Sequence, residues 1–127
     1  MNGWALACLV GVGGSIGAVA RYGVGRWTAK RGGKPRSATL AVNLAGSLAL
    51  GALVGANADE RSEAAFAFAG TGIMGGLTTY STLNAQKAEL TRERQGRQLA
   101  VYVFASYAGG MAAFAAGWLL GRALLRN

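Results

Sequence analysis

The sequence GTGIMGGLTTYST occupies positions 70–82, inside an uncharged stretch that runs from Ala64 to Ala85. In it, the adjacent Gly75 and Gly76 are followed closely by the hydroxyl-bearing run 78–82. Such a sequence predicts a helix that breaks at membrane depth, which a bilayer tolerates only where protein or water satisfies the released backbone groups. The exposed carbonyl groups of a broken helix can hold a cation. The alternative is a continuous helix whose hydroxyl groups bond to its own carbonyls.

Three further stretches are long and nearly free of charge: Gly3–Gly25, Ala38–Ala56 and Leu99–Gly121. Each is close to the roughly 20 residues that cross a bilayer, and Arg21 is the only charged residue in any of them. A soluble helix would carry a polar face at 3.6-residue spacing, whereas these stretches are apolar or small on every side. The sequence therefore predicts an all-α integral membrane protein, with residues 1–127 forming one domain of four transmembrane helices.

Glycine is abundant, with 21 residues in a chain of 127. Helices in lipid associate through close backbone approach at small residues, often in small-xxx-small pairs. One such pair lies in every stretch: Gly13 and Gly17, Gly51 and Gly55, Gly72 and Gly76, and Gly117 and Gly121. Chance accounts for some of these pairs in a glycine-rich chain, but their distribution favours a tightly packed helical bundle.

Catalysis is not expected from this composition. The single cysteine, Cys8, and the absence of histidine leave no disulfide, thiolate metal site or serine–histidine triad within one chain. All five acidic residues lie outside the stretches: Asp59, Glu60, Glu63, Glu89 and Glu93. The net charge of +8 does not point to nucleic acid, because the basic residues are not interleaved with aromatics on one face but flank the apolar stretches.

The distribution of Lys and Arg predicts the orientation in the cell membrane. The predicted loops 26–37 and 86–98 carry nine basic residues: Arg26, Lys30, Arg31, Lys34, Arg36, Lys87, Arg92, Arg94 and Arg97. The opposite side, which includes the predicted loop 57–63, carries three: Arg61, Arg122 and Arg126. The positive-inside rule places the first set in the cytoplasm and both termini outside, in one fixed orientation.

Two polar side chains stand out within the stretches. Asn43 can donate two hydrogen bonds to an anion without adding a fixed charge, although a lone membrane Asn is as often a bond between helices. Arg21 lies near the end of the first stretch, where it can extend to the membrane surface or make a vestibule positive.

Several segments together resemble the small fluoride channels called Fluc or CrcB, along nearly the whole chain. They are GGSIGA at 13–18 leading to Arg21 and Tyr22, TLAVN at 39–43, GIMGGLTTYST at 72–82, and the glycine-bearing fourth stretch. The resemblance implies a dimer of four-helix subunits inserted in opposite orientations, with two narrow anion pathways. It also implies a structural, untransported sodium ion held by backbone carbonyls at the positions of Gly75 and Thr78.

The resemblance also suggests which residues line the fluoride pathway. Asn43, Ser81 and Thr82 are expected to donate hydrogen bonds, because a strongly hydrated anion needs donors along its route. The family carries two phenylalanines whose positive ring edges face the ion; the matching positions here are Tyr80 and Leu83. A line of hydroxyl residues in the fourth helix matches Tyr102, Ser106, Gly110 and Phe114, so Ser106 is expected to line the pathway and the two later positions have lost their hydroxyls.

A fixed orientation favours an inverted paralogue as the partner rather than a second copy of this chain, because a homodimer of inverted subunits requires one sequence to insert both ways. Two other functions stay open. A non-conducting assembly subunit is compatible with Leu83, Gly110 and Phe114. A proton-coupled exporter like the small multidrug transporters needs a carboxylate within the membrane, and the stretches hold none.

Overall fold

The computed structural model describes residues 2–125, and regular structure within them is helical. The helices are α1 (Gly3–Lys30), α2 (Pro35–Gly55), α3 (Ala58–Arg61), α4 (Glu63–Phe66), the π-helix η1 (Ala67–Met74), α5 (Gly75–Leu77), α6 (Ser81–Arg92) and α7 (Gly96–Leu124). Arg126, one of the residues used to predict the orientation, lies outside the described residues.

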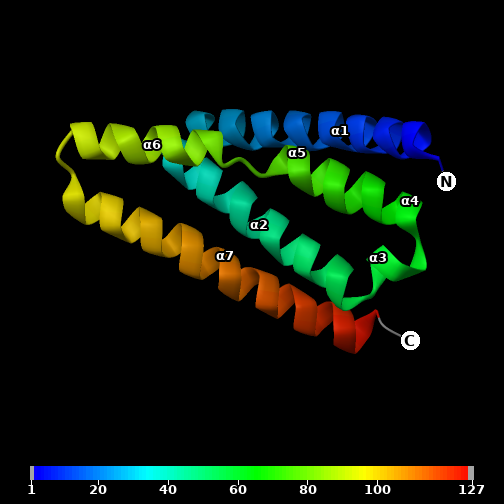
Figure 1. The fold of residues 1–127 in the computed structure, drawn as a ribbon. Coiled ribbons are helices and arrows are strands. Elements are labelled where there is room, and N and C mark those ends of the chain that lie inside the picture. The colour runs from blue at the N-terminus through cyan, green and yellow to red at the C-terminus, as the bar shows by residue number, and fades with distance from the viewer. Residues whose placement is uncertain (1, 126–127) are drawn as a thin grey trace.

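Four passes of the chain make up one bundle, in which α1 packs against the third pass and α2 packs against α7 (Figure 1). Of the described helices, α1, α2 and α7 are long and apolar enough to cross a membrane. The remaining pass is divided among α4, η1, α5 and α6, so no single helix of it spans the bundle. The ends of the described chain lie at the same end of the bundle, as expected for four crossings. The predicted all-α membrane fold is confirmed.

The turns are shorter than the predicted loops, and those loop boundaries were wrong. α1 continues to Lys30 and α2 begins at Pro35, which leaves residues 31–34 instead of 26–37. In the same way, α6 continues to Arg92, and the turn before α7 covers 93–95 rather than 86–98. Hydropathy marks where charge begins, but Arg, Lys, Glu and Gln are good helix formers, so the helices extend beyond the apolar stretches.

The four glycine pairs lie at helix contacts, as predicted. Gly13 and Gly17 of α1 meet the backbone of η1 and α5, where a side chain at Gly17 would overlap the Ile73 carbonyl oxygen. Gly51 and Gly55 of α2 meet the backbone of α7, and Gly117 and Gly121 of α7 meet the backbone of α2. The bundle is therefore two close helix pairs, α1 with η1 and α5, and α2 with α7.

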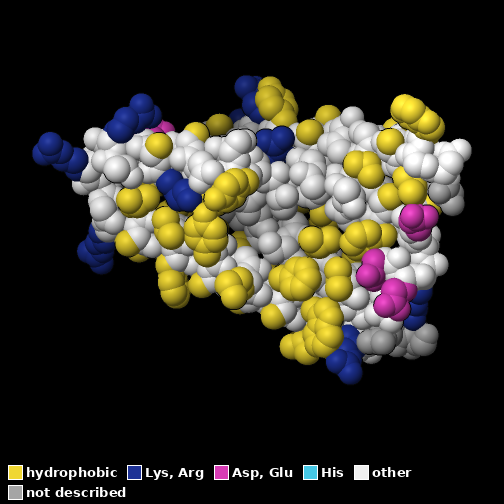
Figure 2. All heavy atoms as spheres, in the orientation of Figure 1, with side chains coloured by type: hydrophobic (Ala, Val, Ile, Leu, Met, Phe, Trp, Pro, Cys, Tyr) yellow, Lys and Arg dark blue, Asp and Glu magenta, His cyan; other side chains and the backbone are white. Residues whose placement is uncertain are grey.

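The exterior is apolar along the bundle and charged at its ends. Large side chains such as Phe104 and Met111 are each 74% exposed, as expected where lipid or a second subunit is the neighbour. Lys and Arg gather toward the end where the turns 31–34 and 93–95 lie, and most visible Asp and Glu lie at the other end (Figure 2). This asymmetry agrees with the predicted orientation.

Candidate functional site

The third pass breaks at Thr78–Tyr80, within the predicted hydroxyl run. α5 ends at Leu77, Thr78 is extended with φ −81° and ψ 156°, and α6 begins at Ser81. The side chain of Asn43 on α2 makes two hydrogen bonds to the backbone of this segment, both to Thr79. Its Nδ2 donates to the Thr79 carbonyl at 3.0 Å, and its Oδ1 accepts from the Thr79 N–H at 2.8 Å. The interhelical role of Asn43 is thus established, with one of its N–H groups left for another acceptor.

The break removes the helical donors that the carbonyls of Gly75 and Thr78 would otherwise have. In a continuous helix these carbonyls would accept from the N–H groups of Thr79 and Thr82. The Thr79 N–H instead donates to Asn43, and the Thr82 N–H donates to the Thr79 hydroxyl at 3.3 Å. Both carbonyl oxygens are consequently available to a ligand, and the surface beside Gly75 is open.

A groove of about 590 Å³ runs alongside the break on the outside of the bundle. It brings together four of the residues predicted for the site: Asn43, Gly75, Thr78 and Tyr80. Ser47 and Thr71 add hydroxyl groups to its lining, and neither was identified from the sequence. The Tyr80 side chain is 64% exposed, so its ring edge is accessible on this face.

Arg21 points into the bundle rather than toward the membrane surface. Its Nε donates to the Gly76 carbonyl at 3.2 Å. Gly76 lies in the last turn of α5, where carbonyl groups lack helical donors and a cation is favourable. The Arg21 side chain therefore contacts the third pass, and its role in a positive vestibule stays a prediction.

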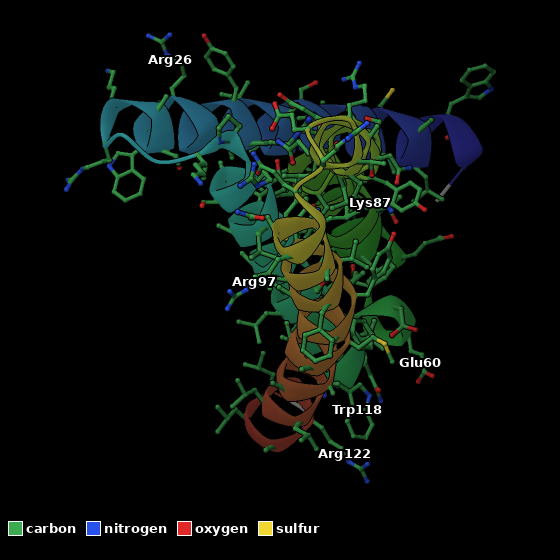
Figure 3. All side chains as sticks on the ribbon, turned by 90° about the vertical axis from the view of Figure 1, so that its left-hand side faces the viewer. Arg26, Glu60, Lys87, Arg97, Trp118 and Arg122 are labelled. Carbon is green, nitrogen blue, oxygen red and sulfur yellow. The ribbon has the colours of Figure 1, made fainter. Side chains whose placement is uncertain are left out.

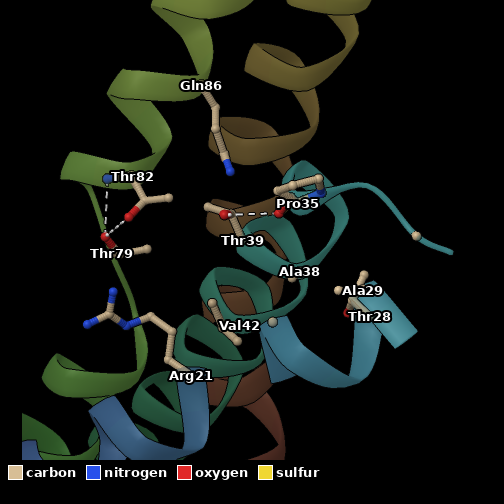
Figure 4. A pocket seen from close by; sticks show the side chains of 12 residues that line it. Arg21, Thr28, Ala29, Pro35, Ala38, Thr39, Val42, Thr79, Thr82 and Gln86 are labelled. Atoms are coloured by element: carbon tan, nitrogen blue, oxygen red, sulfur yellow. Dashed lines mark hydrogen bonds between the residues drawn. The ribbon is translucent and has the colours of Figure 1, made fainter. Parts of the chain in front are cut away.

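A second cavity, of about 230 Å³, lies on the other side of the Thr79 backbone and includes Arg21 in its lining. Gln86 and Thr82 contribute further polar groups (Figure 4). The Gln86 Oε1 accepts from the Tyr102 hydroxyl at 2.6 Å, which leaves the amide N–H groups to face the cavity, as Figure 4 shows. Arg21 is the charged residue in the lining of this cavity, and no Asp or Glu among the described residues lines it.

Thr79 links the hydroxyl groups of the break and was missed as a site residue. Its Oγ1 donates to Thr82 Oγ1 at 3.1 Å and lies 3.5 Å from Ser81 Oγ. Because Thr82 accepts from Thr79, the Thr82 hydroxyl proton is free to be donated elsewhere. Its position in the middle of the hydroxyl run could have identified Thr79 as a candidate. That position does not indicate that Thr79 lines both the groove and the cavity.

The α7 residues form a separate group. Ser106 lies in the lining of neither the groove nor the cavity, but its Oγ is buried and has no hydrogen-bond partner among the described residues. Tyr102 and Leu83 are 6% and 5% exposed and pack together with Leu90 between α6 and α7. Leu83 therefore contributes to the core, which is a sufficient reason for an aliphatic residue there.

One basic side chain lies close to Tyr80. Lys87 Nζ donates to the Tyr107 hydroxyl at 3.0 Å and lies 5.2 Å and 5.8 Å from the ring centres of Tyr107 and Tyr80. The hydrogen bond that Lys87 donates to the Tyr107 hydroxyl raises the pKa of Lys87 above its ordinary value of 10.5. A raised pKa stabilises the protonated amine at every pH below it, so Lys87 is a cation at neutral pH. A cation above the Tyr80 ring interacts with the negative face of the ring, and the positive ring edge stays accessible to an anion.

These features define a class of protein: a small multi-pass membrane protein in which a broken helix lies between two polar recesses without a carboxylate in either lining. The profile of the family described as "CrcB-like protein, Camphor Resistance (CrcB)" matches residues 8–118. The chain belongs to this family.

Curated relatives cover almost all of the chain. "Fluoride-specific ion channel FluC 1" of Geobacillus kaustophilus is 42% identical over 89% of this chain and 95% of its own length. "Fluoride-specific ion channel FluC 2" of Rhodococcus jostii is 46% identical over 87% and 91%. "Fluoride-specific ion channel FluC" of Gloeobacter violaceus is 40% identical over 91% and 95%. The family and the apolar helices make this chain a multi-pass protein of the cell membrane.

Proposed function

We propose that this chain is one subunit of a fluoride-selective passive channel that exports cytoplasmic fluoride. The observation that carries the proposal is the hydrogen-bonded pair of Asn43 and the Thr79 backbone, because it keeps a helix open at membrane depth beside donors suited to an anion. The family, whose relatives are named fluoride-specific ion channels, supplies the ion. Fluoride resistance is the physiological result of such export.

The pathway proposed here begins in the cavity of Arg21, which serves as a vestibule. Thr82, Ser81 and the free N–H of Asn43 donate hydrogen bonds to the ion farther along, and Tyr80 presents its ring edge. Neutral HF entering from an acidic medium dissociates in the cytoplasm, and the membrane potential drives the anion out with about 2.3 kcal/mol per 100 mV. No cofactor turnover or energy source is needed.

We also propose that the released carbonyls of Gly75 and Thr78 hold a structural sodium ion. Carbonyl oxygens from unwound helix are known sodium ligands, and the hydrogen bonds of Thr79 and Thr82 that release them are supporting geometry. Bound there, sodium would fix the break without being transported.

The proposed partner is an inverted paralogue. The basic residues number nine on one side and three on the other, which opposes insertion of one sequence both ways. Relatives in Geobacillus kaustophilus and Rhodococcus jostii carry the numbers 1 and 2 in their names, as expected where an organism has more than one such chain. The open groove beside Gly75 and the exposed Tyr80 offer this partner a face.

Fluoride efflux from liposomes tests the proposal, with a potassium ionophore setting the potential. We expect efflux when the chain and its candidate paralogue are reconstituted together, and much less from the chain alone. Equal efflux from the chain alone would contradict the heterodimer but not the channel. No fluoride efflux in either case would contradict the channel and favour an assembly subunit. Electrogenic efflux without a proton gradient would also exclude a proton-coupled exporter.

The Ser106 hydroxyl provides a first mutational prediction. Ser106 Oγ is buried without a partner among the described residues, so Ser106→Ala removes a desolvated polar group. The variant should have an unchanged or higher melting temperature, and its free energy of unfolding should rise by up to about 1 kcal/mol. If the hydroxyl donates to passing fluoride, efflux should nevertheless fall several-fold. Ser15→Ala is the matched control, because Ser15 Oγ already donates to the Gly11 carbonyl at 2.9 Å. A lower melting temperature for Ser106→Ala would instead show a structural bond to the partner.

The charge of Lys87 provides a second. Lys87→Met should reduce fluoride efflux about threefold at roughly 10 mM salt, and hardly at all at 0.5 M, because a single charge near the path acts through a screened field. Lys30→Met removes a cation at the same end of the bundle but away from Tyr80, and should have little effect at either salt concentration. An equal loss at high and low salt would mean that Lys87 acts by packing.

A further inference from the structure

A third recess lies between the beginnings of α2 and α7, and we refer to it as the basic groove. It has a volume of about 420 Å³, and its cations are Lys34, Arg36 and Arg97. No Asp or Glu lines it. Across the described chain, no ion pair is found for any of these three side chains. The groove therefore presents three positive charges that no acidic side chain of residues 2–125 neutralises in an ion pair.

The wall beneath these charges is apolar. Leu40 follows Arg36 by four residues on α2, and Val101 and Ala105 follow Arg97 by four and eight on α7. Residues four apart share a helix face, one turn of about 5.4 Å farther along. Since both helices run inward from this end, apolar side chains lie directly below the cations, and Val101 is 63% exposed.

The level of the basic groove is that of the lipid headgroups. Its cations stand at the ends of membrane-crossing helices, next to the turn 31–34. At the same end, Arg31 lies 5.1 Å above the ring of Trp27, which is 59% exposed. Tryptophan concentrates at the membrane–water interface, so this pair marks the same depth from a second helix.

The basic groove is also separate from the proposed ion pathway. Viewed along the bundle, Arg97 lies on one side and Lys87, which contacts Tyr80, lies on the other (Figure 3). Tyr102 lines the basic groove, but its hydroxyl group already donates a hydrogen bond to Gln86. The cations of the basic groove therefore lie away from the face of the subunit that carries the broken helix.

We propose that the basic groove binds one anionic glycerophospholipid, with its phosphate on Arg36, Arg97 and Lys34 and an acyl chain along Leu40, Val101 and Ala105. Arginine forms strong charge-assisted bonds to phosphate, and basic recesses between membrane helices are suited to acidic headgroups. An acidic protein segment would match the cations but not the apolar wall at membrane depth. The inference does not depend on fluoride conduction.

Native mass spectrometry of the assembled protein in detergent tests the proposal, with phosphatidylglycerol as the probe. We expect the wild type to retain one tightly bound phosphatidylglycerol, and the Arg36→Gln/Arg97→Gln variant to bind it at least tenfold more weakly. The control variant Arg26→Gln/Arg92→Gln loses the same charge from exposed positions at this end and should bind as the wild type does. Size-exclusion chromatography of each variant checks that the variants assemble.

Two further arms identify the ligand. Ala105→Trp fills the apolar wall without changing charge, and should also weaken phosphatidylglycerol binding. Glycerol phosphate, which has the headgroup without acyl chains, should not displace the lipid at equal concentration. The proposal would be overturned if the wild type retained phosphatidylcholine as tightly as phosphatidylglycerol. It would also be overturned if the control variant lost as much affinity as the Arg36→Gln/Arg97→Gln variant, or if glycerol phosphate displaced the lipid.

Discussion

Gly17→Ala should prevent α1 from docking, and should strongly destabilise the subunit although it adds only one methyl group. A Cβ at Gly17 would overlap the Ile73 carbonyl oxygen and lie 2.7 Å from the Leu77 nitrogen. Both are backbone atoms of η1 and α5, which cannot move aside as a side chain can. Overpacking usually costs about 1–3 kcal/mol, and a backbone collision belongs at or above the upper limit. We expect loss of the monodisperse species in size-exclusion chromatography, or a large fall in melting temperature.

Gly23→Ala is the matched control for Gly17→Ala. Gly23 lies on the same helix, and a Cβ there meets nothing within 4 Å. Ala favours helix over Gly by about 0.5–1 kcal/mol, so this variant should be as stable as the wild type or more so. Equal melting temperatures for the two variants would show that the contact between α1 and η1 is not a close one.

Helix count and packing were predictable because they depend on patterns local in the sequence. Charge-free length gave the four passes, and glycines four apart gave the contacts of Gly17 and Gly117. The break was predictable for a partly mistaken reason. Gly75 and Gly76 are helical, and Gly76 packs on the Gly14 carbonyl, while the helix ends at Leu77, just before the threonines.

The π-helix η1 could not have been predicted. The segment Ala67–Met74 packs against α1, and its eight residues are too few for a π-helix to show a distinct period in the sequence. Such helices often occur at functional sites, and this one leads directly into the break.

The sequence was enough to predict which residue types belong to the candidate site, but not which atoms they bond to. The polarity of Asn43 and Arg21 identified them, yet their acceptors, Thr79 and Gly76, are 36 and 55 residues away in sequence. The orientation of Gln86 depends on a Tyr102 hydroxyl from another helix. Hydrogen bonds between distant backbone and side-chain atoms are not encoded in spacing, so only the structure distinguishes a residue that holds the break from one that binds an ion.

Asn43→Ala should abolish fluoride efflux, with a loss greater than 100-fold, and should also destabilise the subunit. The variant leaves both the N–H and the carbonyl of Thr79 without their partner. An unsatisfied buried group costs about 1–3 kcal/mol. Because the Thr79 backbone is only partly buried between the groove and the cavity, the two groups together should lower the free energy of unfolding by about 1–3 kcal/mol. Asn84→Ala is the control, because Asn84 is exposed on α6 and should change neither property.

The stability of Asn43→Ala and Asn43→Asp separates two roles for this residue. Asn43→Asp keeps the acceptor for the Thr79 N–H, but it sets an anionic oxygen against the Thr79 carbonyl and repels fluoride. It should therefore abolish efflux while retaining part of the stability that Asn43→Ala loses. If instead Asn43→Ala lost efflux at an unchanged melting temperature, Asn43 would act on the ion alone, and the break would be held by the hydroxyl bonds between Thr79 and Thr82. Because both amide atoms lie within 3.0 Å of the Thr79 backbone, we expect the losses of stability and efflux to occur together.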